Sequence, residues 1–179
     1  WQPLGKTVYA GETLVVYVGH NTKRTGDNTN LNLVMTQYHA ESSSLAKSTS
    51  ALKVGRNEIT VPQVTDKDFE RGGQLYVAYS GNNASDKYAV RVLGGSDIPV
   101  LNVYGKTGKE RTNTIRAYID SLEKHTANIE AEHEKIHKNG QKAVNYEYDQ
   151  QNCILNATDI MMEKMMYSLP ATKVWEPLS

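Results

Sequence analysis

Short runs of β-favouring residues, separated by turn residues, occupy the chain as far as Tyr104. Ala10-Gly11 divides the first two runs, which is typical of a turn between strands. Leu31 and Leu33 alternate with Asn32 and therefore share one face of a strand. Strands of this length and spacing favour a β-sandwich or jelly roll. We expect strands within 8–18, 31–38, 59–61, 74–79, 88–93 and 100–104, turns at 55–57, 72–73 and 94–95, and surface loops at 21–30 and 39–50.

At Lys109 the spacing of apolar residues changes to steps of three and four, which predicts one face of a helix. The stripe is long enough for about seven turns, and Gly140 is a plausible stop. Arg, Asp, Glu, Lys and Asn fill the positions between. The residues of the stripe are Ile115, Tyr118, Ile119, Leu122, Thr126, Ile129, His133 and Ile136.

A second helix is predicted near the end of the chain. Asn156 would cap it, Asp159 would lie in its first turn, and Pro170 would bound it. Its apolar residues are Ile160, Met161, Met162, Met165 and Met166. The expected fold is therefore mainly β with appended α. A β-sandwich or jelly-roll domain would span 1–105, and a helical connector with a long helix and a Met-rich helix would span 106–179.

The ends and the composition limit what the chain can be. It begins at Trp1 without an initiator methionine, so we expect a fragment of a larger protein with any targeting signal outside it. No run approaches the roughly 18 apolar residues of a membrane span. Basic and acidic residues balance at 20 each, which gives no indication of a nucleic-acid partner. Cys153 is the only cysteine, which excludes an internal disulfide.

The motif H-E-x-x-H occurs at residues 133–137 and raises the hypothesis of a zinc hydrolase. His133 and His137 would supply two nitrogens from one helix face, with Glu134 as general base. Glu147 or Asp149 would be the third ligand. A catalytic zinc helix is usually buried, whereas Glu, Lys and Asn surround this motif, and Glu147 follows an irregular polar stretch. We therefore favour a half-buried packing histidine at His133 and expect no metal or catalytic residue here.

Aromatic residues and methionines suggest two surfaces. The tyrosines Tyr76, Tyr79 and Tyr88, together with Trp1 and Trp175, could stack on sugar rings, although tyrosines on a sheet surface usually only pack. The Met-rich stretch could be an adaptable binding surface. We favour a second interpretation of that stretch, in which it is an interface to a domain absent from this chain.

The stretches that carry a family resemblance follow one another along nearly the whole chain. They are KTVYAGETLVVYV at 6–18, LKVGRNEI at 52–59, GGQLYV at 72–77, GG at 94–95 with IPV at 98–100, CILNATDI at 153–160, and MMYSLPA at 165–171. By these stretches the chain resembles the N-terminal region of the enhancin-like zinc metallopeptidases that target mucins and glycoproteins, in particular their secreted clostridial-type members.

The resemblance implies a β-sandwich that packs against a gluzincin catalytic domain. The family's own H-E-x-G-H motif lies in an apolar helix downstream of the Met-rich stretch, beyond Ser179, with a glutamate as third ligand. The motif at 133–137 lacks the glycine, so no catalytic residue of the family is carried onto this chain. The resemblance also implies secretion or a cell-surface location, and zinc in the full-length parent but no cofactor in this fragment.

These expectations combine into one leading hypothesis with two alternatives. The leading one is the non-catalytic N-terminal portion of a secreted zinc metallopeptidase acting on glycoproteins. Its partners would be the missing catalytic domain of the same chain and a glycoprotein or glycan. The first alternative is a free-standing carbohydrate- or protein-binding module. The second is a zinc hydrolase that uses the motif at 133–137.

Overall fold

The computed structural model describes residues 1–36, 46–62, 71–138 and 155–179. Within the long helix, the side chains of residues 130 and 132–138 lie outside this description. The chain divides into two compact units, Trp1–Ser96 and Asp97–Ser179. The elements of the first unit are β1 (Gln2–Tyr9), β2 (Thr13–His20), β3 (Leu31–Thr36), β4 (Ala46–Ser48), β5 (Gly55–Thr60), β6 (Arg71–Tyr79) and β7 (Tyr88–Leu93), followed at the boundary by β8 (Ser96–Asp97).

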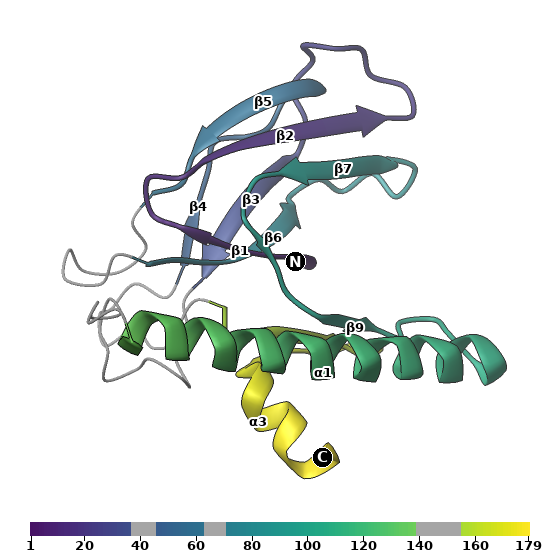
Figure 1. The fold of residues 1–179 in the computed structure, drawn as a ribbon. Coiled ribbons are helices and arrows are strands. Elements are labelled where there is room, and N and C mark those ends of the chain that lie inside the picture. Colours follow the sequence, from purple (N-terminus) through teal and green to yellow (C-terminus); the bar gives the residue numbers. More distant parts are fainter. Residues whose placement is uncertain (37–45, 63–70, 139–154) are drawn as a thin grey trace. The chain divides into compact units, whose positions relative to one another are not determined.

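The first unit is a β-sandwich, as the strand spacing predicts. One sheet has the order β4-β3-β6-β1-β8 and the other the order β5-β2-β7. Figure 1 shows the three strands of the smaller sheet side by side. Side chains from both sheets form one core, because alternate residues of each strand point inward. The buried core residues are Val8, Leu14, Val16, Val18, Leu31, Leu33, Met35, Leu52, Val61 and Leu75.

Two glycine-containing connections of this unit agree with the predicted turns. Gly11, with φ of 81°, lies between β1 and β2, and its N–H donates to the Val61 carbonyl at 2.8 Å. Gly94 and Gly95 have φ of 98° and 68° and carry the chain from β7 in one sheet to β8 in the other. Such backbone angles are available to glycine without steric cost. The Gly95 N–H donates to Glu12 Oε1 at 2.6 Å, which fixes the crossing to the start of β2.

Three local predictions for this unit are wrong. Residues 55–57, expected as a turn, form the first half of β5 and pair with β2. Residues 72–73, expected as a flexible pair, lie within β6. The expected loop at 39–50 contains the short strand β4. In each case a neighbouring strand supplies hydrogen bonds that outweigh the weak strand preference of Gly, Asn and Ser.

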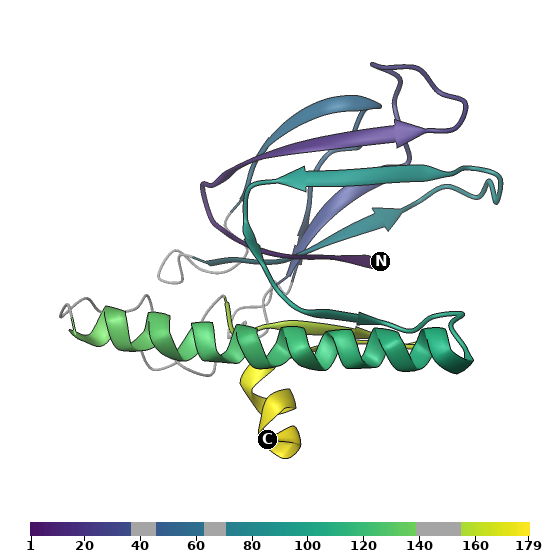
Figure 2. The same ribbon diagram turned by 45° about the vertical axis from the view of Figure 1, so that its right-hand side comes forward.

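The second unit is a mixed α/β structure. It contains β9 (Val100–Asn102), α1 (Gly108–Lys138), β10 (Thr158–Met161), β11 (Met166–Leu169), α3 (Ala171–Trp175) and a 3₁₀ turn at Glu176–Leu178. The sheet order is β11-β10-β9, with β9 and β10 parallel. Figure 2 shows α1 as one long helix. Its predicted stripe is confirmed where side chains are described, since the buried residues of this core include Tyr118, Leu122 and Ile129 together with Leu101, Val103 and Ala171.

The prediction of a Met-rich helix is wrong, because this stretch forms a β-hairpin. Strands β10 and β11 pair in register from Thr158↔Leu169 to Met161↔Met166, and the Met162 N–H donates to the Met165 carbonyl to close the turn. Methionine favours helices when its surroundings are neutral. Here β9 offers a parallel partner to β10 from a part of the chain about sixty residues earlier, and this non-local pairing overrides the local preference.

Asn156 does cap a helix, but a different one from the helix predicted. Its side-chain Oδ1 accepts a hydrogen bond from the Thr172 N–H at 3.0 Å, in the first turn of α3. Pro170 is the N-cap residue of α3 and makes no side-chain cap bond. Asn156 therefore serves as a cap from a distant position in the chain, and its side chain is fully buried.

The boundary between the compact units lies at Ser96/Asp97, earlier than the expected 105. Strand β9 was expected to complete the sandwich, but it pairs with β10 and belongs to the second unit. That unit is therefore more than a helical connector. Among the described residues, no helix combines the length and the apolar composition needed to cross a bilayer.

Candidate functional site

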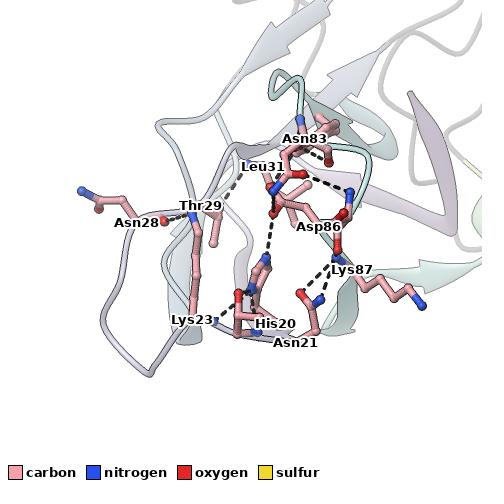
Figure 3. Close-up of polar contacts among 12 residues, drawn as sticks. His20, Asn21, Lys23, Asn28, Thr29, Leu31, Asn83, Asp86 and Lys87 are labelled. Atoms are coloured by element: carbon pink, nitrogen blue, oxygen red, sulfur yellow. Dashed lines mark hydrogen bonds and ion pairs between the residues drawn. The ribbon is translucent and has the colours of Figure 1, made fainter.

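A polar and aromatic cluster lies at one end of the sandwich, where the loop after β6 meets the end of β2 (Figure 3). The Tyr79 hydroxyl lies 3.0 Å from Asp86 Oδ2 and 3.2 Å from the Asn83 carbonyl oxygen, the two acceptors for its single proton. It accepts a hydrogen bond from the Asn83 N–H. The Asn83 amide donates to Asp86 Oδ1 at 2.8 Å. Partial burial and then the bond to Asp86 raise the pKa of Tyr79.

His20 joins this cluster from β2, and its side chain is only 1% exposed. Its Nδ1 accepts the backbone N–H groups of Thr22 at 3.0 Å and Lys23 at 2.9 Å. Because Nδ1 acts as an acceptor, the ring proton of the neutral histidine lies on Nε2. Nε2 faces Asp86 Oδ1 at 3.5 Å, a distance at which attraction is mainly electrostatic (Figure 3).

The two ring nitrogens of His20 thus differ, because Nδ1 accepts hydrogen bonds whereas the buried Nε2 makes none with a described residue. One fixes the turn after β2, and the other faces Asp86. The Thr22 hydroxyl also lies 3.3 Å from Nδ1, within the same turn. These contacts tie His20 to its own loop, so we assign the pair a structural role. Asn21 adds to this role, since its amide donates to the Ser85 carbonyl at 3.1 Å and its oxygen accepts the Lys87 N–H.

The three tyrosines proposed as glycan contacts differ in exposure. Tyr76 is 1% exposed and packs against Trp1 with ring centroids 5.9 Å apart, so it offers no face to a ligand. Tyr88 is half-buried and packs on His20 at 4.5 Å. Tyr79 is 42% exposed, but its hydroxyl is hydrogen-bonded to Asp86 in the loop after β6. Tyr79 is the only one of the three with an accessible ring, and a glycan contact there stays a prediction.

The H-E-x-x-H motif falls at the end of α1. The side chains of His133, Glu134 and His137 lie outside the described residues, as do Glu147 and Asp149. Among the residues that are described, no three His, Cys, Asp or Glu side chains gather as a metal site would require. The described side chains therefore include no group of ligands that fits zinc.

A second polar network lies inside the second unit. Thr158 Oγ1 donates to the Pro99 carbonyl at 2.9 Å, and the Tyr118 hydroxyl lies 2.9 Å from the same Oγ1. Burial raises the pKa of Tyr118. Asp159 is fully buried, and its Oδ1 accepts from Ser168 Oγ at 2.6 Å. These bonds connect β10 to β11, to α1 and to the segment before β9, which identifies them as structural.

His125 connects α1 to the start of the hairpin. Its Nε2 lies 2.8 Å from the Leu155 carbonyl oxygen and must donate, because a carbonyl only accepts. The side chain is partly buried, and burial lowers the pKa of His125 below its ordinary value of 6.5, although the bond to Leu155 acts in the opposite direction. The folded chain therefore resists protonation of this residue.

The free energy of unfolding is expected to fall as the pH falls below about 6.5. In this window the unfolded chain takes up a proton on His125 that the folded chain does not, so acid favours unfolding until the lower folded-state pKa is passed. Denaturant unfolding of wild type and His125→Gln between pH 7.5 and 5 measures this effect. Gln keeps a donor for Leu155 but does not titrate, so its profile should be flatter. Identical profiles would contradict the prediction.

Exposed apolar side chains gather on the β10–β11 hairpin. Met162, Met165 and Tyr167 are 37%, 57% and 42% exposed. The Tyr167 hydroxyl donates to Met165 Sδ at 3.2 Å, so two of these side chains lie together. We refer to Met162, Met165 and Tyr167 as the hairpin surface. Exposed apolar groups that gather in this way are typical of an interaction surface.

No family model and no curated protein matches the chain. Solved structures do. The ZmpB metallopeptidase from Clostridium perfringens matches with a TM-score of 0.67 at 23% identity, over 98% of this chain and 30% of that chain. The ZmpB M60 catalytic domain with the CBM51-1 and CBM51-2 domains, from the same organism, matches with 0.65 at 26% identity, over 98% of this chain and 16% of that chain.

A third structure is the M60 catalytic domain of Clostridium perfringens ZmpC in complex with the sialyl T antigen. It matches with a TM-score of 0.64 at 20% identity, over 99% of this chain and 31% of that chain. The chain thus spans less than a third of the length of each of these structures. These matches support the resemblance to the enhancin-like, M60-type metallopeptidases, with which the chain shares the fold of one part.

Proposed function

We propose that the chain is the non-catalytic N-terminal portion of a secreted zinc metallopeptidase that acts on glycoproteins. The observation that carries this proposal is the extent of the structural match. Nearly the whole chain, 98%, corresponds to a part of the ZmpB metallopeptidase, whereas that part is only 30% of the ZmpB chain. On this proposal the peptidase chemistry belongs to the remainder, as does the zinc.

The role of the chain is then to brace the catalytic remainder. The hairpin surface supports this role, because its methionine and tyrosine side chains offer apolar area to a packed neighbour. Burying an apolar side chain of this size contributes about 1.5–3 kcal/mol. We take the occupant of the hairpin surface to be the catalytic remainder of the same metallopeptidase. Tyr167 is held in β11 by its pairing with Ile160, and Met162 and Met165 flank the turn, where the Met162 N–H donates to the Met165 carbonyl.

The second unit is built to keep the hairpin rigid. Asp159 and Ser168 join β10 to β11 by a buried hydrogen bond of 2.6 Å, and β9 continues the sheet on the other side of β10. Breaking a buried hydrogen bond is costly, because its donor and acceptor would be left unpaired away from water. A rigid hairpin loses little conformational entropy when it packs against a neighbour, which favours a permanent interface.

The first test is the zinc content and peptidase activity of the purified chain, dialysed and compared with His137→Ala. We expect no stoichiometric zinc and no cleavage of a mucin-type glycoprotein in either protein, because a complete ligand set belongs to the remainder. One zinc per chain in wild type, absent from His137→Ala, would overturn the proposal and favour a zinc hydrolase that uses the motif at 133–137. Metal content measured by elemental analysis separates the two outcomes without depending on a choice of substrate.

A further inference from the structure

The outer face of the β5-β2-β7 sheet carries a row of three residues with complementary chemistry. Tyr17 on the central strand β2 is paired in register with Arg56 on β5 and with Arg91 on β7. All three are exposed, and the Tyr17 side chain is 42% exposed. Their neighbours in sequence, such as Val16 and Val18, point into the core. The tyrosine therefore lies on the solvent side with an arginine on each flank.

The rows on either side leave room above this tyrosine. One neighbouring row, two residues along β2, consists of Gly19 opposite Ala89. A Cβ added to Gly19 would meet nothing closer than the Ala89 side chain at 3.7 Å. The other neighbouring row consists of Val15, paired with Leu93 on β7, which is 43% exposed, and with the exposed Glu58 on β5. Adjacent rows on one face are about 7 Å apart. The ring of Tyr17 is therefore bordered by small residues on one side. On the other side it is bordered by an apolar pair toward β7 and by the Arg56-bound carboxylate of Glu58 toward β5.

The two arginines differ in what they bind within the chain. Arg56 donates to Glu58 Oε2 at 2.8 Å, and this bond is the main cause of its raised pKa. Arg91 has no such acid. Among the residues that the structure describes, no carboxylate lies within ion-pair distance of it, and it makes no hydrogen bond to another described side chain. No described side chain therefore occupies the guanidinium donors of Arg91.

We propose that Tyr17, Arg56 and Arg91 form a binding platform for a saccharide that carries a carboxylate. The apolar face of a sugar ring stacks on Tyr17, and Arg91 donates two parallel N–H bonds to the carboxylate. Arg56 holds the tyrosine from the opposite flank. Directly opposed residues of neighbouring strands have Cβ atoms about 5 Å apart, so one sugar residue can contact Tyr17 and Arg91 together.

The choice of a saccharide rests on the proposed function, in which the substrate is a glycoprotein. The choice of an anionic saccharide rests on Arg91, because a neutral sugar would offer no negative charge to its guanidinium. A structural role for the row is the competing explanation, since arginines beside a tyrosine also stabilise a sheet through cation–π contact. That role predicts no discrimination between charged and neutral sugars, and this difference decides between the two.

The test uses the full chain, labelled with ¹⁵N and titrated with 3′-sialyllactose and, separately, with lactose. We expect amide shifts confined to β2 and β7 around Tyr17 and Arg91, with the sialylated sugar binding about tenfold more tightly than the neutral one. Arg91→Gln should remove this preference, and Tyr17→Ala should abolish binding of both sugars. Arg24→Gln and Tyr9→Ala, at exposed positions elsewhere in the first unit, serve as matched controls and should bind as wild type does.

Equal binding of the two sugars, or a preference that survives in Arg91→Gln, would overturn the proposal, as would absence of shifts at β2 and β7. Arg91→Gln changes only an exposed side chain, so the test holds even where Tyr17→Ala proves unstable. Absence of selective sugar binding would leave the supporting role untouched. That role is tested separately, by zinc content and by the peptidase activity of a chimera in which this chain replaces the matching part of the ZmpB metallopeptidase. Failure of the supporting role with selective sialyllactose binding would instead point to a free-standing carbohydrate-binding module.

Discussion

Replacing Gly95 with alanine is expected to lower the free energy of unfolding by about 2–5 kcal/mol. Gly95 has φ of 68°, where an L-residue with a Cβ is strained by about 1–2 kcal/mol. An added Cβ would also lie 2.9 Å from the Thr7 carbonyl oxygen and 2.9 Å from Val8 Cγ1. A backbone oxygen of a paired strand cannot move aside cheaply, and overpacking of this kind costs about 1–3 kcal/mol more.

Gly11→Ala is the matched control for this substitution. Gly11 has a similar φ of 81°, but a Cβ at this position would meet nothing within 4 Å. We expect Gly11→Ala to cost about 1 kcal/mol, from backbone strain alone. Denaturant unfolding of both variants measures the difference, which isolates the contact with β1. Equal losses would mean that β1 and the crossing at 94–95 are not as close as the structure places them.

The sandwich was predictable because its signals are local. The turn at Ala10-Gly11 and the strand at 88–93 follow from β-favouring runs bounded by turn residues, and the helical stripe through Leu122 follows from its period. These signals depend on residues close together in sequence. They indicate which segments form strands or helices, but they do not indicate which strands pair.

The β10–β11 hairpin was not predicted because it depends on which strands pair. Met161 and Met166 belong to a stretch whose composition favours helix, and its strand state depends on pairing with β9, which lies far back in the chain. Glu163 and Lys164, the two residues between Met162 and Met165, form the exposed turn. Both favour helices, so the local sequence carried no turn signal.

The polar cluster and the platform were missed because their parts are distant in sequence. His20 and Asp86 are brought together by the pairing of β2 with β7, and neither belongs to a recognisable motif. Tyr17 and Arg91 likewise become neighbours only through register. A one-residue slip would have placed Tyr17 in the core, so knowledge of the register was needed before the row could be identified.

The largest functional effect is expected from Met165→Glu within a whole metallopeptidase. Met165 is 57% exposed on the hairpin surface, where the supporting role requires apolar contact with the catalytic remainder. A glutamate there would lose that contact and bury a charge without a partner, which costs several kcal/mol. Every 1.4 kcal/mol changes an equilibrium about tenfold. We therefore expect the fraction of enzyme in which the hairpin surface is packed against the catalytic remainder, and with it the peptidase activity, to fall at least about tenfold. Tyr9→Glu is the control, since Tyr9 is 49% exposed and lies in the other unit.

The most direct measurement is the peptidase activity of a chimera in which this chain replaces the 30% of the ZmpB metallopeptidase that it matches. The supporting role predicts an active chimera, strongly reduced activity with Met165→Glu, and unchanged activity with Tyr9→Glu. Folding of each protein is checked by thermal unfolding. A folded chimera without activity, or equal activity in the Met165→Glu and Tyr9→Glu proteins, would contradict the role proposed for this chain.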